Sequence, residues 1–243
     1  MFDREKFELE KELIVDNLDT NNSIRELALN FVNESNKEKY AYIWNWFGLP
    51  IIQMPEDIVK VQEIIFASKP DLIIETGVAW GGSLLLNASV LSATGKGRVI
   101  GIDLTIPKHN RKAIMESPLS HLITLVEGSS TDIDLVASIS DSIPQNSNVM
   151  LILDSHHTAD HVIRELELWS PIVKNGNFIV VCDTIVDFIE APADRPREWS
   201  KGNSPMTAVL HFLGQNPRFE GSDIYNKKNQ TGFHPGGVLQ AIR

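Results

Sequence analysis

The sequence has little cysteine, few basic residues and no long apolar runs. Cys182 is its only cysteine, which excludes an internal disulfide and is typical of proteins from reducing compartments. The formal net charge is −10, which argues against nucleic acid or an anionic membrane as the main partner. No stretch comes near the roughly eighteen apolar residues of a membrane-spanning helix, and the charged N-terminus has no apolar signal core. We therefore expect a soluble, cytoplasmic protein that binds neither nucleic acid nor membrane.

The N-terminal fifth of the chain has the pattern of a helical extension. Leu9 and Leu13 recur at helical spacing, and a polar run over 17–22 predicts a turn before a second helical segment. An aromatic cluster follows near the end of this region. We interpret 1–50 as an extension that packs on a main domain, 51–243, or covers its substrate pocket or another subunit.

The main domain alternates short apolar strands with helices, which is the pattern of a mostly parallel sheet with helices on both faces. Pro55 and the acids after it are typical of the first turn of a helix. The sequence therefore predicts a Rossmann-like α/β fold. Strands are expected at 72–74, 99–102, 122–126, 149–153, 178–181 and 237–242, and helices at 55–67, 81–92, 132–139, 159–169 and 205–213.

Acidic residues stand at the carboxyl ends of the first five predicted strands. In open α/β sheets, ligands bind beyond these strand ends, so acids that recur there are expected to share one site. Chance would scatter such residues over the surface. The five acids are Glu75, Asp103, Glu127, Asp154 and Asp183.

The turn after the first of these strands contains glycines that let a ligand approach the backbone, and a helix N-terminus follows it. The turn lacks the G-x-G-x-x-G dinucleotide fingerprint because Ala79 replaces the second glycine. The acid that follows the next strand is placed to accept the ribose hydroxyls of a nucleoside. The predicted cofactor-binding residues are Glu75, Gly77, Gly81, Ser83, Asp103, Ser129 and Asp154.

Four motifs resemble a known family. The segment 70–77 with Gly81-Gly82-Ser83 looks like motif I of class I methyltransferases; together with 153–158, 182–184 and 235–239 it resembles the cephalosporin hydroxylase / rhamnosyl O-methyltransferase family. The likeness extends from about residue 44 to residue 242. It implies a class I methyltransferase that uses S-adenosylmethionine and Mg²⁺ or another divalent cation to methylate a hydroxyl of a sugar or natural product. Homo-oligomers are expected from the same resemblance.

The resemblance places metal ligands at Asp154, at Asp183 and at the residue before the latter. These two aspartates end adjacent strands in the class I order, so both can reach one ion beside the cofactor. The third position is Cys182, where glutamate is expected, and a thiol is a poor ligand for Mg²⁺. Three alternatives follow: a two-carboxylate Mg²⁺ site completed by water, a softer metal, or no metal. We favour the first.

His157 matches the histidine of the family's D-x-x-H pattern. A hydroxyl is a weak nucleophile until it loses its proton, and imidazole titrates near neutral pH. We therefore assign His157 and Asp154 to catalysis, with His157 as metal-proximal ligand or general base; the alternative is a structural histidine. The loop 185–203 is long enough to form a substrate lid, and disorder is its alternative.

Two other functions stay open. A catalytically silent binding partner with this fold would account for Cys182. A nicotinamide-dependent oxidoreductase is disfavoured by the incomplete glycine fingerprint. The sequence identifies neither the acceptor nor the position methylated.

Overall fold

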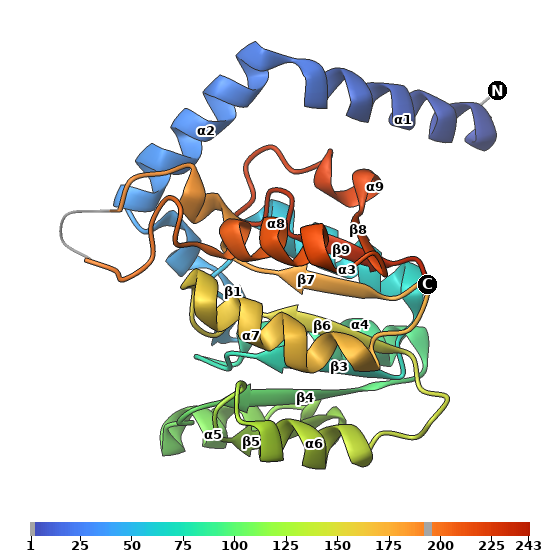
Figure 1. Cartoon of the computed structure of the whole chain (residues 1–243), viewed down its shortest axis with the longest axis vertical. Helices are drawn as coiled ribbons and strands as arrows, with labels where there is room; N and C mark the ends of the chain where they lie inside the picture. Colours follow the sequence, from blue (N-terminus) through green and yellow to red (C-terminus); the bar gives the residue numbers. More distant parts are fainter. Residues whose placement is uncertain (1–2, 192–195) are drawn as a thin grey trace.

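The computed structural model describes residues 3–191 and 196–243. Helices α1 (Arg4–Thr20) and α2 (Asn22–Lys37) form an arm over the main domain (Figure 1). The predicted turn over 17–22 is wrong for most of its length, because α1 continues to Thr20 and only Asn21 separates the helices. The side chain of Asn21 caps α2 by accepting a hydrogen bond from the Ile24 amide at 3.2 Å. The extension continues through η1 (Tyr40–Ile43), β1 (Asn45–Trp46) and β2 (Leu49–Pro50).

A seven-stranded sheet in the order β5-β4-β3-β6-β7-β9-β8 forms the centre of the main domain. Strands β3 to β7 are parallel to one another, and β9 runs antiparallel to both of its neighbours, β7 and β8. The expected Rossmann-like, mostly parallel sheet is therefore confirmed. The strands are β3 (Leu72–Thr76), β4 (Arg98–Asp103), β5 (Ile123–Glu127), β6 (Val149–Leu153), β7 (Phe178–Val181), β8 (Phe219–Gly221) and β9 (Val238–Ala241).

The register of the central strands brings their ends together at one edge of the sheet. Thr76, the last residue of β3, pairs with Ile102 on one side and with Leu153 on the other. Leu153 in turn pairs with Val181 at the end of β7. The residues that follow these strands therefore emerge side by side, as parallel topology requires.

Helices cover both faces of the sheet because successive strand residues point to opposite sides. Ile73 belongs to the core beneath α3, α4 and α5, whereas its neighbour Ile74 belongs to the core beneath α6, α7 and α8. No described helix has the combination of length and apolar character that crossing a bilayer needs. The helices are α3 (Pro55–Ser68), α4 (Gly82–Thr94), α5 (Lys108–Met115), α6 (Ile133–Asp141), α7 (Ala159–Trp169), α8 (Pro205–Gln215) and α9 (Asp223–Asn226), with 3-10 turns η2 (Ser120–Leu122), η3 (Ser170–Ile172) and η4 (Thr184–Asp187).

Candidate active site

The glycine-rich turn after β3 passes directly over the end of β6. Gly77 has a φ of +90°, and a Cβ at this position would lie 2.0 Å from the carbonyl oxygen of Asp154. Glycine is the residue that tolerates both the left-handed backbone and the close approach. The turn thus brings its own backbone, the start of α4 and Asp154 into one small region.

Asp103 holds this turn from the neighbouring strand. One of its carboxylate oxygens accepts hydrogen bonds from the amides of Val78 and Ala79, at 2.8 and 3.3 Å. The carboxylate also faces a cavity of about 510 Å³, which we call the turn cavity. Its volume lies in the range of cofactor pockets. Among its lining residues are Gly77, Asp103, Ser129, Asp154, His156 and His161.

A smaller hollow continues from the turn cavity toward the start of α4. It measures about 50 Å³ and is lined by Gly81 and Ser83, and it shares Gly77 and Asp154 with the larger cavity. Of the predicted cofactor residues, Gly77, Gly81, Ser83, Asp103, Ser129 and Asp154 therefore line two neighbouring cavities that share lining residues.

Glu75 is the exception, because its side chain is buried beneath the turn and lines neither space. Its carboxyl accepts hydrogen bonds from the Ser83 hydroxyl and from the Asn87 amide nitrogen. Burial raises the pKa of Glu75 to about 7, against the opposing effect of these two donors. The structure thus places Glu75 as a support for the turn and the first helical residues of α4.

Asp154, His157 and Asp183 form a compact group, which we call the acid–histidine cluster. One ligand atom from each residue lies within 4.8 Å of the other two, and all three side chains are half-buried. Nε2 of His157 is 3.3 Å from a carboxylate oxygen of Asp183. Burial, and next the charge of Asp183, raise the pKa of Asp154 well above its usual range. A divalent cation among these donors would relieve the repulsion between the carboxylates, so the donor set fits such an ion.

The resemblance places a third metal ligand at Cys182, whereas the structure brings His157 to the two carboxylates. The thiol is buried in the apolar core on the α3–α4 face of the sheet, and it is not part of the cluster. Burial also raises the pKa of the Cys182 thiol well above its usual range, which disfavours the thiolate that binds metals. Side chains along β7 alternate between the two faces of the sheet, so Cys182 lies with Phe178 and Val180 on the α3–α4 face.

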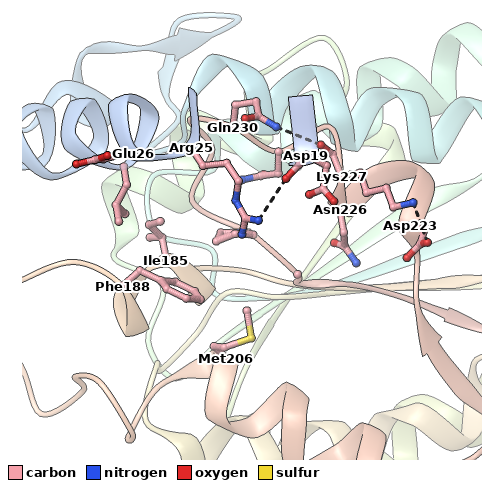
Figure 2. A pocket seen from close by; sticks show the side chains of 14 residues that line it. Asp19, Arg25, Glu26, Ile185, Phe188, Met206, Asp223, Asn226, Lys227 and Gln230 are labelled. Carbon is pink, nitrogen blue, oxygen red and sulfur yellow. Dashed lines mark hydrogen bonds and ion pairs between the residues drawn. The ribbon is translucent and has the colours of Figure 1, made fainter. Parts of the chain in front are cut away.

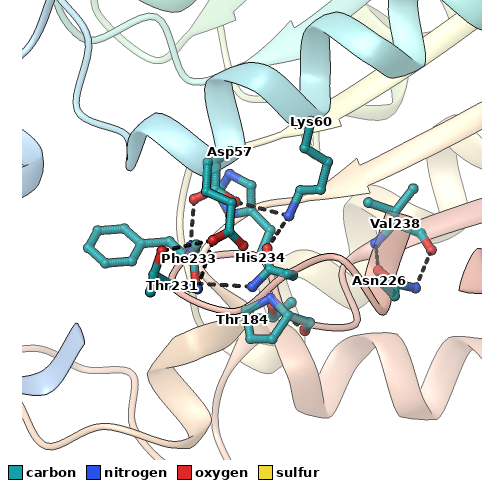
Figure 3. Close-up of polar contacts among 12 residues, drawn as sticks. Asp57, Lys60, Thr184, Asn226, Thr231, Phe233, His234 and Val238 are labelled. Atoms are coloured by element: carbon teal, nitrogen blue, oxygen red, sulfur yellow. Dashed lines mark hydrogen bonds and ion pairs between the residues drawn. The ribbon is translucent and has the colours of Figure 1, made fainter. Parts of the chain in front are cut away.

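The backbone of Asp183 is fixed by a contact that the sequence did not predict. Asp183 has a left-handed φ of +56°, and its amide donates a 3.0 Å hydrogen bond to Nδ1 of His234. His234 is buried, and burial lowers its pKa, which keeps Nδ1 available as an acceptor. Beneath it lies the buried pair Asp57–Lys60, at 2.9 Å, whose aspartate also accepts from the Phe233 amide (Figure 3). The loop around His234 thereby ties Asp183 to α3.

Two further groups surround the cluster. The indole ring of Trp199 packs edge-on against the imidazoles of His156 and His157, with ring centroids 5.3 and 5.1 Å away. His161, on the wall of the turn cavity, is 2.9 Å from the Ser155 hydroxyl. Trp199 belongs to the long loop 185–203, of which residues 192–195 lie outside the described residues.

Comparison with known proteins agrees with this arrangement. A model of the rhamnosyl O-methyltransferase/CmcI family matches residues 38–242. The rhamnosyl O-methyltransferases of Mycobacterium leprae and Mycobacterium tuberculosis are each 28% identical to the chain, over 152 and 148 residues. These alignments cover 59% and 58% of this chain but 62% and 57% of the relatives, so the chain spans less than two thirds of their length.

Solved structures share the fold at low sequence identity. A structure of CmcI described with Mg and SAM has a TM-score of 0.58 and 18% identity, covering 83% of this chain and 78% of its own. The O-methyltransferase TomG from Streptomyces achromogenes, described in complex with SAM, has a TM-score of 0.56 and 14% identity, covering 89% and 90%. An O-methyltransferase from Bacillus cereus, described with SAH, has the same TM-score and identity and covers 96% of both chains.

The family match carries more weight than these fold likenesses. It runs from the end of α2 to the last strand and includes every residue of the turn cavity and of the acid–histidine cluster. The chain therefore belongs to the rhamnosyl O-methyltransferase/CmcI family.

Proposed function

We propose that this protein is an S-adenosylmethionine-dependent O-methyltransferase, assisted by a divalent cation, that methylates a hydroxyl of a sugar or natural product. One observation carries the proposal. Asp154 lines the turn cavity and is also a member of the acid–histidine cluster, so a cofactor site and a candidate cation site meet at one carboxylate. The family membership supports the reaction type.

The cofactor fits the turn cavity in a defined orientation. Asp103 offers a carboxylate to the ribose hydroxyls, and Gly77 allows the backbone to lie close to the ligand. Ser129 and His161 also line this cavity, and we place the adenine beside them. S-adenosylmethionine supplies an electrophilic methyl group, which an in-line displacement delivers to the acceptor oxygen.

The acid–histidine cluster provides the acid–base chemistry. Nε2 of His157 is the nitrogen that faces the carboxylates, and we assign to it the proton of the acceptor hydroxyl. Asp183 orients this imidazole through its 3.3 Å contact with Nε2. Asp154 and Asp183 would hold the cation, with Mg²⁺ or Mn²⁺ as ions that accept carboxylate ligands, and a bound cation lowers the pKa of a hydroxyl that contacts it.

The first experiment measures conversion of S-adenosylmethionine to S-adenosylhomocysteine across a panel of rhamnosides and other hydroxylated glycosides and natural products. Assays contain Mg²⁺, Mn²⁺, Zn²⁺ or EDTA. We expect turnover with Mg²⁺ or Mn²⁺ and loss of turnover in EDTA. Asp154→Asn and Asp183→Asn should each lower kcat by at least about a hundredfold, because each removes one of the two carboxylate charges that would bind the cation.

Titration calorimetry separates the cofactor site from the cation site. Asp103→Asn should weaken S-adenosylhomocysteine binding, whereas Asp183→Asn should leave it nearly unchanged. Full turnover in EDTA would remove the cation from the proposal. Cofactor binding without turnover or metal binding would favour a catalytically silent partner, and binding of NAD in place of S-adenosylmethionine would favour an oxidoreductase.

We also propose that the enzyme acts in the cytoplasm as a homo-oligomer. The single buried cysteine and the acidic charge support the compartment. The exposed apolar side chains of the N-terminal extension support self-association.

A further inference from the structure

A second cavity lies between the N-terminal arm and the C-terminal part of the main domain (Figure 2). It measures about 610 Å³, within the size range of small-molecule sites. We call it the extension cavity. None of its lining residues lines the turn cavity or the hollow beside it, and none belongs to the acid–histidine cluster. It is therefore a separate feature of the molecule.

Arg25 of α2 supplies a cation to this cavity. In Figure 2 its side chain extends from α2 toward the part of the cavity where Phe188 and Met206 lie. Its hydrogen bond goes to the carbonyl oxygen of Asp19 at 3.2 Å, and no carboxylate of the described residues pairs with it. A guanidinium has five N–H donors, so several are left for a ligand.

Three acidic residues line the cavity, Asp19, Glu26 and Asp223, and within the described part of the chain none of their carboxylates forms an ion pair with this guanidinium. Asp223 is 3.2 Å from Lys227, which is also 3.1 Å from Asp16. The Glu26 carboxylate points away from the guanidinium in Figure 2. Arg25 is thus the cation in the extension cavity that has no carboxylate partner among residues 3–191 and 196–243.

The rest of the cavity offers an apolar surface. Phe188 remains 50% exposed although it lies in a concavity beside Ile185 and Met206. An exposed aromatic ring in a concavity provides contact area for the apolar body of a ligand.

From these features we infer that the extension cavity binds a small amphiphilic anion: a carboxylate, sulfonate or phosphate on an aromatic or aliphatic body. The anion pairs with Arg25, and the body packs on Phe188 and Met206. Ile185 and Phe188 lie within and just after η4, the turn that begins directly after Asp183. The ligand would therefore contact the segment that follows the acid–histidine cluster.

The test uses anilinonaphthalene sulfonate, a fluorescent aromatic anion, as the probe of the full-length protein. We expect saturable binding with a stoichiometry of one per chain. Arg25→Gln should weaken binding by about tenfold or more, since it removes a charge-assisted contact. Phe188→Ala should weaken it by a similar factor through the lost apolar contact. Both residues are partly exposed, so the variants are expected to fold, as circular dichroism would verify.

Matched controls distinguish this site from general surface binding. Arg98→Gln removes an exposed arginine, and Phe66→Ala an exposed phenylalanine, outside the extension cavity; both should leave probe affinity unchanged. Saturating S-adenosylhomocysteine should not displace the probe, which keeps this result independent of the proposed methyl transfer. Unchanged affinity in Arg25→Gln, equal losses in the control variants, or displacement by S-adenosylhomocysteine would each overturn the inference.

Discussion

At the scale of single residues, Glu75 supports the glycine turn through a buried carboxyl group. Its hydrogen bonds come from two neutral side chains, Ser83 and Asn87. Burial raises its pKa from 4.5 to about 7, so the folded chain binds this proton more tightly than the unfolded chain. The stabilising effect is complete below pH about 4.5 and is lost as the pH rises toward 7. A shift of this size corresponds to about 3 kcal/mol between the two ends of the window.

We therefore predict that Glu75→Gln flattens the dependence of stability on pH. Glutamine can accept from the Asn87 amide through its oxygen and donate to the Ser83 hydroxyl through its nitrogen, without the buried charge. Urea unfolding between pH 5 and pH 8 would measure this, with the exposed Glu220→Gln as the control. The variant should gain stability relative to the wild type at pH 8. Because the pKa of Asp154 is also raised, the variant should keep a smaller slope of stability against pH, of the same sign. A slope equal to that of the wild type would contradict the prediction.

Gly77 allows a second test at this scale, because the chain contains a matched glycine. Gly77 and Gly95 both have left-handed backbones, but a Cβ at Gly95 meets nothing within 4 Å. Gly95→Ala should cost about 1 kcal/mol of stability and leave cofactor binding intact. Gly77→Ala adds a collision with the Asp154 carbonyl, so we expect at least a tenfold loss in S-adenosylhomocysteine affinity by calorimetry. Equal affinities in the two variants would show that the close approach does not matter for binding.

The candidate site was predictable from the sequence where residues follow apolar strands. Asp103, Asp154 and Asp183 end such strands, and parallel topology then requires them to meet. The contact between Asp183 and His234 was not predictable, since it joins residues 51 positions apart through loop geometry. The exclusion of Cys182 from the cluster was equally hidden, because it depends on which face of the sheet the side chain takes.

At the scale of secondary structure, the segment around Trp199 is held against the start of α7. The Asn203 side chain accepts a 3.0 Å hydrogen bond from the Ala159 amide, and Ser200 forms a backbone bridge with Asn203. These contacts keep the Trp199 ring against His156 and His157. The sequence left open whether this loop forms a lid, and its described part lies beside the acid–histidine cluster.

We predict that Trp199→Ala lowers kcat by about tenfold, because His157 loses a packing partner and its imidazole becomes less well positioned. Trp199→Phe should restore most of the activity, since edge-on ring contact is what the position provides. Steady-state kinetics with a methyl acceptor would measure both variants. The affinity for S-adenosylhomocysteine should not change. Full activity of Trp199→Ala, or equal losses in both variants, would refute a positioning role for the ring.

Elements with strong apolar patterns were predicted, and weakly apolar or short ones were not. The five parallel strands and helices such as α7 follow runs of buried residues in the sequence. Helix α5 was missed because its sequence is mostly polar, with only Asn110 and Ile114 buried. Strand β8 is three residues long and acquires its identity by pairing with β9, which no local pattern indicates.

At the scale of the whole molecule, apolar surface is concentrated in the N-terminal extension. Ten of the twenty large apolar side chains that are exposed in the described residues lie within 3–47. Helix α1 has no buried residue, although it is tied to the domain by the pair Lys227–Asp16 at 3.1 Å. Exposed apolar groups at this density are typical of protein interfaces. A symmetric homo-oligomer is the commonest way to cover them.

The outer face of α2 provides the sharpest test of self-association. Leu27 and Phe31 are one helical turn apart and are 67% and 47% exposed, while Ala28 and Val32 face the domain. Placing two aspartates on the outer face should therefore leave the contact with the domain intact. We predict that the double variant Leu27→Asp/Phe31→Asp sediments as a smaller species than the wild type, because a charge at a packed apolar interface loses its hydration without gaining a partner.

The matched control places aspartates on α3, at Val59 and Phe66, which are also exposed but lie outside the extension. This variant should sediment like the wild type. Sedimentation velocity over a range of protein concentrations would resolve the species, and the melting temperature of each variant would report on folding. A wild-type protein that is monomeric at all concentrations would contradict the prediction. So would an oligomer that the α2 variant leaves intact, since the exposed face of α2 would then lie outside the interface.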